Sequence, residues 1–419
     1  MLIDNLTEII GNTPTIRIDK SIHKLENIEV FAKLEYLNPF GSIKDRTAFE
    51  MLINEIEQIK NSKSIVIETS SGNTAKAIQC ICGIYGIDFT TVTNRIKVDE
   101  SKHILNFIGT KIKEIASNKN GVDEIKRIIN ISPNKYFHTS QYDNKNNYLA
   151  HKKTAQEIYN DIGCVDYFFH VLGTSGSSKG ISDFLKEKNS NMQNYGVVTS
   201  NGSYIPGIRT QQELEECGFF SFNNYHKIIT VDANTAKEYS KLLCRRSGIL
   251  AGISSGASFC ALISKLKEID HTLTTKQRAL FVVCDRIETY ANFIKNNRFH
   301  KYHVLGNTYT VIDPSNISFE LNKENISIIC NKEYGIGSDG IIVAQLDNKN
   351  EHNLFNYRAY NSNGSEIDNA VFGSIIYAKY LIDSNIVQSK ELEVNIKKTK
   401  MKVFFSDIDN TNSQIYLDF

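Results

Sequence analysis

One lysine stands where a helix is expected to begin. The segment Asn38–Arg46 (NPFGSIKDR) is punctuated by Pro39 and Gly41, and a helical pattern starts at about Lys44. The positive end of the helix dipole repels a cation at that place, so a lysine there gains from losing its charge. A Schiff-base lysine has to lose its charge, and Lys44 is therefore a candidate for covalent catalysis. A solvated surface lysine is the alternative for this segment taken alone.

Two turns rich in serine and glycine could bind anions. The segment Glu68–Thr74 (ETSSGNT) lies between an expected strand and an expected helix, and its N–H groups and hydroxyls would suit a carboxylate. The segment Gly173–Gly180 (GTSGSSKG) also follows a strand and opens a helix. Its glycines would let the backbone approach a phosphate, although the turn lacks the ending of a P-loop. An ordinary helix cap or a plain strand-to-helix turn is the alternative for each.

A further turn, Gly252–Ser258 (GISSGAS), again precedes a helix. A serine there could exchange one hydrogen bond with a ring nitrogen, although an ordinary cap is the alternative. A serine would not hold a pyridine nitrogen protonated, as an aspartate would. The ring would then be a less complete electron sink, which favours elimination chemistry over transamination.

The elements that must position these turns alternate short β-branched runs with helical patterns. Strands are expected over residues 28–34, 64–68, 88–93, 167–172, 194–199 and 278–284, and helices from residue 74 and around residues 101–108. Strand, turn and helix in repetition predict parallel sheets with helices on both faces, which is an α/β architecture. A ligand then belongs at the turns that follow the carboxyl ends of the strands.

Composition limits the classes of function. The 419 residues include 48 Lys and Arg against 47 Asp and Glu, and this near-neutral balance gives no electrostatic case for binding nucleic acid or an anionic membrane. The eight cysteines are dispersed without a C-x-x-C pair, so no metal site is expected. The first residues lack the basic start of a signal peptide, and no apolar run approaches the roughly 18 residues of a membrane span. We therefore expect a cytoplasmic protein with reduced thiols.

The pattern of the chain changes near residues 296–300. The chain after it is richer in short alternating strands and has one long helical pattern near residues 372–382. We place a domain boundary at about residue 298, with domains over 1–297 and 298–419. A compact junction is expected because no low-complexity linker is present.

Taken in order, the four turns resemble the motifs of fold-type II pyridoxal-phosphate enzymes of the cysteine synthase group. The opening segment Ile10–Pro14 (IGNTP) is similar to the first motif of that group. The resemblance covers residues 1–297 and implies a catalytic domain of two parallel-sheet subdomains, the smaller one inserted at about residues 45–150. It also implies pyridoxal 5'-phosphate as the cofactor, amino acids as small-molecule substrates and a homodimer.

The resemblance implies a role for each matching residue. Lys44 would form the Schiff base with the cofactor, Asn73 would contact the ring hydroxyl, and Ser254 would contact the pyridine nitrogen. The cofactor phosphate would be held by the glycine-rich turn, namely Gly173, Thr174, Ser175, Gly176 and Ser177. The substrate carboxylate would be held by the serine-rich turn and one amide, namely Ser70, Ser71, Gly72, Thr74 and Gln141. The group usually has glycine at the position of Ser175, but serine keeps a hydrogen-bond donor there.

The chemistry implied by the resemblance is β-replacement on a serine derivative. The substrate amine displaces Lys44, the freed lysine removes the α-proton, and a leaving group departs from the β-carbon to give an aminoacrylate. A nucleophile then adds, and the lysine returns the proton. A dehydratase, in which water takes the place of the nucleophile, ranks below this reaction.

Three segments of this chain resemble one branch of the group, whose enzymes serve siderophore and antibiotic biosynthesis. They are Phe31–Pro39 (FAKLEYLNP), Cys284–Arg286 followed by Tyr290, and Ser203–Ile208 (SYIPGI). Enzymes of that branch join O-phospho-L-serine and L-glutamate into N-(2-amino-2-carboxyethyl)-L-glutamate, a precursor of 2,3-diaminopropionate. Arg209 stands where the group often has a small residue, and it could pair with a phosphate or a second substrate carboxylate, a surface arginine being the equal alternative. A cysteine synthase that uses sulfide is the alternative activity.

The segment 298–419 resembles the N-terminal half of a diaminopimelate epimerase. Its motifs are Lys301–Tyr309 (KYHVLGNTY), Tyr334–Gly340 (YGIGSDG) and Asn361–Glu366 (NSNGSE). That family places a catalytic cysteine and Gly-Asn-Gly at the start of the next helix, where this chain has Ala370 and then Val371. Alanine can be neither acid nor base, and only one of the two halves is present, so epimerisation by this segment alone is not expected. A structural, dimerisation, docking or ligand-sensing role stays open.

The segment 298–419 lacks the cysteine on which epimerase chemistry depends. A decayed, non-catalytic protein with a binding or regulatory role is therefore the alternative to an enzyme. Lys44 and the residues expected to support it are all retained. Their retention favours the enzyme.

Overall fold

The computed structural model describes the chain except for residues 1, 95–97, 117–118, 202, 292–293, 295–298, 315–316, 318, 346–353, 369–370, 385, 388, 390, 398, 406–414 and 419. The chain folds into two compact units, Met1–Ala291 and Asn292–Phe419. The division lies a few residues before the expected boundary at residue 298, which itself falls outside the described residues. Each unit has its own sheet structure and its own core.

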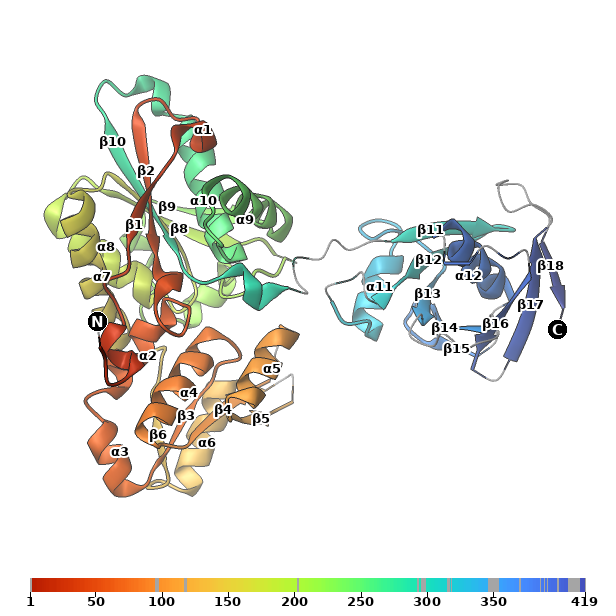
Figure 1. Cartoon of the computed structure of the whole chain (residues 1–419), viewed down its shortest axis with the longest axis horizontal. Helices are drawn as coiled ribbons and strands as arrows, with labels where there is room; N and C mark the ends of the chain where they lie inside the picture. Colours follow the sequence, from red (N-terminus) through yellow and green to blue (C-terminus); the bar gives the residue numbers. More distant parts are fainter. Residues whose placement is uncertain are drawn as a thin grey trace. The chain divides into compact units, whose positions relative to one another are not determined.

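A six-stranded sheet forms the larger subdomain of the first unit. Its strands lie in the order β1 (Thr15–Ile18), β2 (Ile28–Leu34), β10 (Gln277–Val283), β7 (Tyr167–Val171), β8 (Gln193–Thr199) and β9 (Lys227–Val231). All neighbours are parallel except β1, which pairs antiparallel with β2. One side of the sheet carries α7 (Asn146–Ile162) and α8 (Gly176–Lys188), and the other carries α9 (Ala233–Ser247) and α10 (Ile253–Lys267) (Figure 1). Every residue of β7 is buried, as expected of a parallel strand covered on both faces.

A four-stranded parallel sheet forms the smaller subdomain, drawn in orange in Figure 1. Its order is β5 (Lys111–Glu114), β4 (Phe89–Thr93), β3 (Ile65–Glu68) and β6 (Tyr136–His138). The helices are α2 (Lys44–Leu52), α3 (Ile56–Ser62), α4 (Asn73–Tyr85), α5 (Asp99–Phe107) and α6 (Gly121–Ile131). Buried residues of α2, α3 and α4, such as Met51, Ile59 and Ile78, pack in one core with Val66 of β3.

Shorter helical turns complete the first unit. They are η1 (Leu6–Ile9), α1 (Lys20–His23), η2 (Glu35–Leu37), η3 (Gln212–Glu216), η4 (Phe222–Asn224), η5 (Asp270–Thr272) and η6 (Ile287–Tyr290). Each strand that the sequence predicts in this unit is present, with both ends within one residue of the expected ones. The predicted α/β architecture with two parallel-sheet subdomains is thus confirmed.

The second unit is built on an eight-stranded mixed sheet. Its order is β11 (His300–Val304), β12 (Asn307–Ile312), β13 (Gly340–Gln345), β14 (Leu354–Asn361), β16 (Glu391–Ile396), β17 (Thr399–Phe405) and β18 (Ile415–Asp418), with β15 (Glu366–Ile367) paired to β14. Its helices are α11 (Lys323–Cys330) and α12 (Val371–Asp383). The helix predicted near residues 372–382 is α12, and its Tyr377 and Leu381 pack in the core of this unit. Ala370, which the resemblance to diaminopimelate epimerases matches with their cysteine, lies outside the described residues.

No helix in the described part of the chain is both long enough and apolar enough to cross a membrane.

Candidate active site

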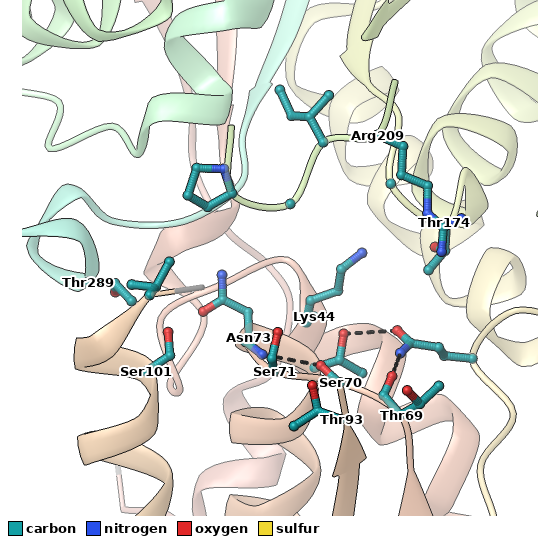
Figure 2. Close-up of a pocket in the computed structure, with 18 of the residues that line it drawn as sticks. Lys44, Thr69, Ser70, Ser71, Asn73, Thr93, Ser101, Thr174, Arg209 and Thr289 are labelled. Carbon is teal, nitrogen blue, oxygen red and sulfur yellow. Dashed lines mark hydrogen bonds between the residues drawn. The ribbon is translucent and has the colours of Figure 1, made fainter. Parts of the chain in front are cut away.

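A cavity of about 370 Å³ is lined by residues from both subdomains of the first unit. Ten residues that the sequence predicted for the site line it together: Lys44, Ser70, Ser71, Gly72, Asn73, Thr74, Gln141, Gly173, Thr174 and Arg209. Figure 2 shows the side chain of Lys44 extending into the space between the loop of Ser70, Ser71 and Asn73 and the side chain of Arg209. Four other predicted residues are buried and are not part of its lining: Ser175, Gly176, Ser177 and Ser254.

Lys44 is the first residue of α2, as the sequence predicts. The loop that leads to it is held to the six-stranded sheet by a hydrogen bond from Ile43 N to Cys284 O at 2.8 Å. The amine of Lys44 forms no hydrogen bond or ion pair with the residues that the structure describes. Burial lowers the pKa of this amine, while Cys284 and Asp285 act in the opposite direction. A lowered pKa enlarges the fraction of neutral amine, which is the nucleophilic form.

The turn after β3 forms one wall of the cavity. Ser70 Oγ accepts hydrogen bonds from Gly72 N at 3.4 Å and from Ala75 N at 3.3 Å, so this hydroxyl caps the start of α4. Ser71 makes no hydrogen bond to the described residues, and its N–H and hydroxyl stay available to a ligand anion. Ser70 therefore shapes the turn, and Ser71 presents donors to the cavity.

Gln141 is held beside this turn by buried polar groups. The carboxylate of Glu68, at the end of β3, accepts from Gln141 N at 2.9 Å and from Thr139 Oγ1 at 2.6 Å. The side-chain Nε2 of Gln141 donates to Thr69 O at 2.7 Å, and its Oε1 accepts from Thr74 Oγ1 at 3.1 Å. One hydrogen of Nε2 remains, so Gln141 can still donate to a bound substrate.

The glycine-rich turn joins β7 to α8 and is crowded at two glycines. A Cβ on Gly173 would lie 2.8 Å from Gly207 O, and a Cβ on Gly176 would lie 2.7 Å from Asn147 Cγ. Asn147 is fully buried, and its Nδ2 donates to Gln141 O at 2.6 Å. The turn is thus packed against the segment that carries Gln141, and side chains are excluded where the backbone would approach a phosphate.

A buried histidine supports the same turn. Nε2 of His170, in β7, lies 2.7 Å from Ser177 Oγ. Burial lowers the pKa of His170 to about 3, so the ring is neutral at physiological pH. His170 therefore holds the hydroxyl of Ser177 without adding a charge next to an expected phosphate.

Ser175 occupies the position where glycine is usual, and its backbone is left-handed with φ 64° and ψ 0°. The residue is buried, and its Oγ has no hydrogen-bond partner among the described residues. A buried hydroxyl without a partner, placed in a turn of glycines, is what a bound anion would satisfy. This position therefore combines a strained backbone with a buried hydroxyl that is close to Tyr225 but outside hydrogen-bond geometry.

Replacing Ser175 with glycine is expected to move two properties in opposite directions. Glycine removes the steric penalty of the left-handed backbone, so the apo-protein should gain roughly 1 kcal/mol in its free energy of unfolding. Loss of the hydroxyl should weaken binding of the expected cofactor about threefold to tenfold. Thermal melting of the apo-protein and a titration with pyridoxal phosphate measure the two effects. Unchanged affinity would show that the hydroxyl does not reach the phosphate.

Arg209 reaches the cavity from the loop after β8. Its backbone N donates to Leu172 O at 2.9 Å, and its Nη1 donates to Glu213 O at 2.7 Å. The guanidinium carbon lies 5.0 Å from the centre of the Tyr142 ring. Arg209 lines the cavity near Thr174, as Figure 2 shows, rather than standing on the open surface.

Several lining residues were not predicted from the sequence, namely Thr93, Val98, Ser101, Tyr142 and Thr289. Tyr142 directly follows Gln141, and Thr289 lies next to the quoted Tyr290, so a wider reading of these motifs could have found them. Ser101 comes from the first turn of α5, where a serine carries no signal of its own. Its place in the cavity depends on how α5 packs, which the local sequence does not determine.

Comparison with known proteins gives one family. A sequence profile described as "Pyridoxal-phosphate dependent enzyme" matches residues 6–285, which ends before the second unit. Cysteine synthase B of Campylobacter jejuni is 33% identical over 315 residues, covering 68% of this chain and 96% of that protein. A cysteine synthase of Aquifex aeolicus is 29% identical over 276 residues, covering 64% of this chain and 84% of that protein.

Solved structures agree with this match. A hydrogen sulfide-producing enzyme of Fusobacterium nucleatum is similar with a TM-score of 0.62 and 27% identity, covering 69% of this chain and 98% of that one. An O-acetylserine dependent cystathionine beta-synthase of Helicobacter pylori has a TM-score of 0.63 at 24% identity, covering 70% of this chain and 98% of that one. At that identity the second likeness concerns the fold alone.

Proposed function

We propose that this chain, which belongs to the family of pyridoxal-phosphate dependent enzymes, replaces the β-substituent of an O-activated L-serine. O-phospho-L-serine is the favoured donor. The observation that carries the proposal is Lys44. Its amine stands at the start of a helix, in a cavity, without an ion-pair partner among the described residues. It faces a turn with free donors for a carboxylate. The cysteine synthases among the relatives support this class of reaction.

The turns that border the cavity, including buried residues outside its lining, fit the cofactor of this family. The unpartnered hydroxyl of Ser175 lies in the turn proposed to hold the phosphate, and Gly173 and Gly176 keep side chains out of it. Ser254, at the start of α10, is the residue proposed to meet the ring nitrogen. When bound, pyridoxal phosphate would supply the electron sink that makes the α-proton of an amino acid removable.

The groups of the chain itself would orient the substrate and move its proton. The N–H of Ser71 and the remaining amide hydrogen of Gln141 would bind the substrate carboxylate. Lys44 Nζ would take the α-proton and later return it, for which its lowered pKa is suited. The turn of Ser70–Thr74 and the amine of Lys44 would thus act on the same substrate carbon from fixed positions.

Arg209 supports phosphate as the leaving group. A guanidinium carries five donors in a planar fork, and phosphate or carboxylate is the group that matches this fork. Nη1 donates to Glu213 O, and the guanidinium carbon lies 5.0 Å from the centre of the Tyr142 ring. Arg209 lines the same cavity as Lys44, where an anionic group on the substrate side chain would meet it.

Replacing Arg209 with alanine should reduce kcat/KM for O-phospho-L-serine about 10- to 100-fold, because a charge-assisted hydrogen bond contributes about 1.5–3 kcal/mol. The same variant should change kcat/KM for O-acetyl-L-serine by less than about threefold, because the acetyl ester group carries no charge for Arg209 to bind. Arg209→Lys serves as the matched control, since it keeps the charge and loses the fork. Equal losses of kcat/KM for both donors would show that Arg209 does not bind the phosphate of the substrate.

We propose an amine, L-glutamate in the first place, as the nucleophile, so that the product leads to 2,3-diaminopropionate in siderophore-type biosynthesis. The motifs around Phe31–Pro39 and Cys284–Arg286 support this choice. Sulfide is the second candidate, because the curated relatives named above are cysteine synthases. Incubation with O-phospho-L-serine and either L-glutamate or sulfide, followed by mass analysis of the product, tests the two. Cysteine as the only product would overturn the amine proposal.

The second unit is proposed to have no epimerase activity of its own. Ala370 stands where the epimerases have their cysteine, and a unit of this length corresponds to only one of their two halves. Buried residues of α12 pack in a hydrophobic core of this unit, which is consistent with a structural role.

A further inference from the structure

Three side chains from two segments that are distant in the sequence meet at the wall of the cavity. Asn73 Nδ2 donates to Asp285 Oδ2 at 2.6 Å, and the hydroxyl of Tyr290 donates to the same oxygen. Asp285 and Tyr290 are each only 4% exposed, while Asn73 and Tyr290 line the cavity. Asp285 therefore connects two residues of the cavity wall from behind.

The backbone leaves Asp285 little freedom. Its carbonyl oxygen accepts from Gly252 N at 2.9 Å, and it forms an isolated bridge with Ser42, two residues before Lys44. A Cβ on Gly252 would overlap Asp285 Oδ1, so only glycine fits next to this carboxylate. The carboxylate thus stands at a fixed place between the start of α10 and the loop that carries Lys44.

A carboxylate determines which way a carboxamide points. An ionised carboxylate only accepts hydrogen bonds, so it draws the nitrogen of Asn73 toward itself. Burial raises the pKa of Asp285 above its usual range, while the hydrogen bonds from Tyr290 and Asn73 act in the opposite direction. Both bonds go to Oδ2, so this oxygen accepts from Asn73 whether or not Oδ1 carries a proton. The carbonyl oxygen of Asn73 and the second hydrogen of its nitrogen are then left for the cavity. Without Asp285, the two ends of the carboxamide could exchange places.

The same hydrogen bond joins the two subdomains. Asn73 begins α4 of the four-stranded subdomain, and Asp285 follows β10 of the six-stranded sheet. The start of α4 is therefore tied to the sheet that carries the glycine-rich turn. A relative shift of the subdomains would have to break this bond.

We propose that Asp285 is a positioning residue for the reaction, which holds the carboxamide of Asn73 in the orientation that the bound cofactor needs and is itself held by Tyr290. The inference rests on the function proposed above. It assigns a role to a residue that does not line the cavity and that acts through another side chain.

A double-mutant cycle tests the inference. Asp285→Asn keeps the size of the side chain and removes its charge, and Asn73→Ala removes the group on which it acts. Asp285→Asn is expected to weaken binding of pyridoxal phosphate to the apo-protein about tenfold and to lower kcat about 10- to 100-fold, with KM changed less than about threefold. In the Asn73→Ala background the same substitution should change each quantity less than about twofold. Tyr290→Phe, which leaves the carboxylate in place, should reproduce the loss more weakly, about three- to tenfold.

Asp270→Asn is the matched control. Asp270 is also a buried carboxylate, but it accepts from the backbone N of Glu26 and Asn27, outside the cavity lining. Its loss should lower the melting temperature and leave cofactor affinity and kcat unchanged. An undiminished effect of Asp285→Asn in the Asn73→Ala background, or no effect in the parent, would overturn the inference.

The melting temperature of the apo-protein separates this inference from the proposed function. If the parent protein did not bind pyridoxal phosphate, the proposed function would fail. The same four proteins would still report whether Asn73 and Asp285 are coupled in the fold, because their bond needs no cofactor. Additive shifts in melting temperature would then overturn the positioning role.

Discussion

Replacing Lys44 with alanine is expected to abolish β-replacement, with kcat at least about a thousandfold lower, because the variant has neither the amine that bonds the cofactor nor the base that moves the α-proton. The visible absorption of lysine-bound cofactor should disappear from the purified variant. The fold should survive, since the amine has no hydrogen bond or ion pair with the described residues and its removal leaves no partner unsatisfied. Steady-state rates with O-phospho-L-serine and an absorption spectrum measure both effects.

Lys153→Ala is the control for this substitution. Lys153 lies on α7, pairs with Glu50 at the surface and does not line the cavity. Its replacement should leave the rate and the spectrum unchanged, because an exposed ion pair contributes about 0–1 kcal/mol. Turnover by Lys44→Ala at a rate near that of the parent would refute the assignment of Lys44 as the catalytic amine.

Replacing Gly176 with alanine is expected to have the second largest effect. The added Cβ would overlap Asn147, which is fully buried and hydrogen-bonded to Gln141 O, so it cannot swing away. The free energy of unfolding should fall by about 1–3 kcal/mol, as for other overpacked sites. Affinity for pyridoxal phosphate should fall at least about tenfold, since the start of α8 would be displaced from the phosphate. Thermal melting and cofactor titration measure the two losses.

Gly83→Ala is the matched control. Gly83 lies near the end of α4, is exposed and has nothing within 4 Å of the position of an added Cβ. Alanine should stabilise the helix there by about 0.5–1 kcal/mol and leave cofactor binding unchanged. A Gly176→Ala protein that bound the cofactor as tightly as the parent would show that the glycine-rich turn does not hold the phosphate.

The sequence was sufficient to predict the framework of the site. The run over residues 167–172 is apolar and aromatic except for His170, and the turn after it is rich in glycine, so β7 and the start of α8 follow from local pattern. The turn after β3 follows from the same pattern. Each turn follows the carboxyl end of a parallel strand, where a ligand is expected. Because β3 and β7 lie in different sheets, the meeting of Lys44, Asn73 and Thr174 at one cavity followed from the resemblance to the cysteine synthase group and not from local pattern.

The contacts that tune the site could not be predicted in this way. Asn73 and Asp285 are 212 residues apart in the sequence, and nothing in either segment indicates their hydrogen bond. The left-handed backbone of Ser175 and the contact of Arg209 with the ring of Tyr142 likewise depend on tertiary packing. Serine at a left-handed position even argues locally against such a backbone. These features could be found only in the three-dimensional structure. They depend on contacts between elements that are distant in the sequence, and a local sequence pattern does not indicate which of these elements lie close together.

The most direct test of the account is the visible absorption spectrum of the purified full chain, recorded before and after O-phospho-L-serine and O-acetyl-L-serine are added in turn. The purified protein is expected to be yellow because Lys44 holds pyridoxal phosphate. Its spectrum should change when O-phospho-L-serine is added and should change less when O-acetyl-L-serine is added. A change with O-acetyl-L-serine alone would contradict the proposed donor. A colourless protein that stays unchanged after pyridoxal phosphate is supplied would contradict the central claim that this cavity is a working active site.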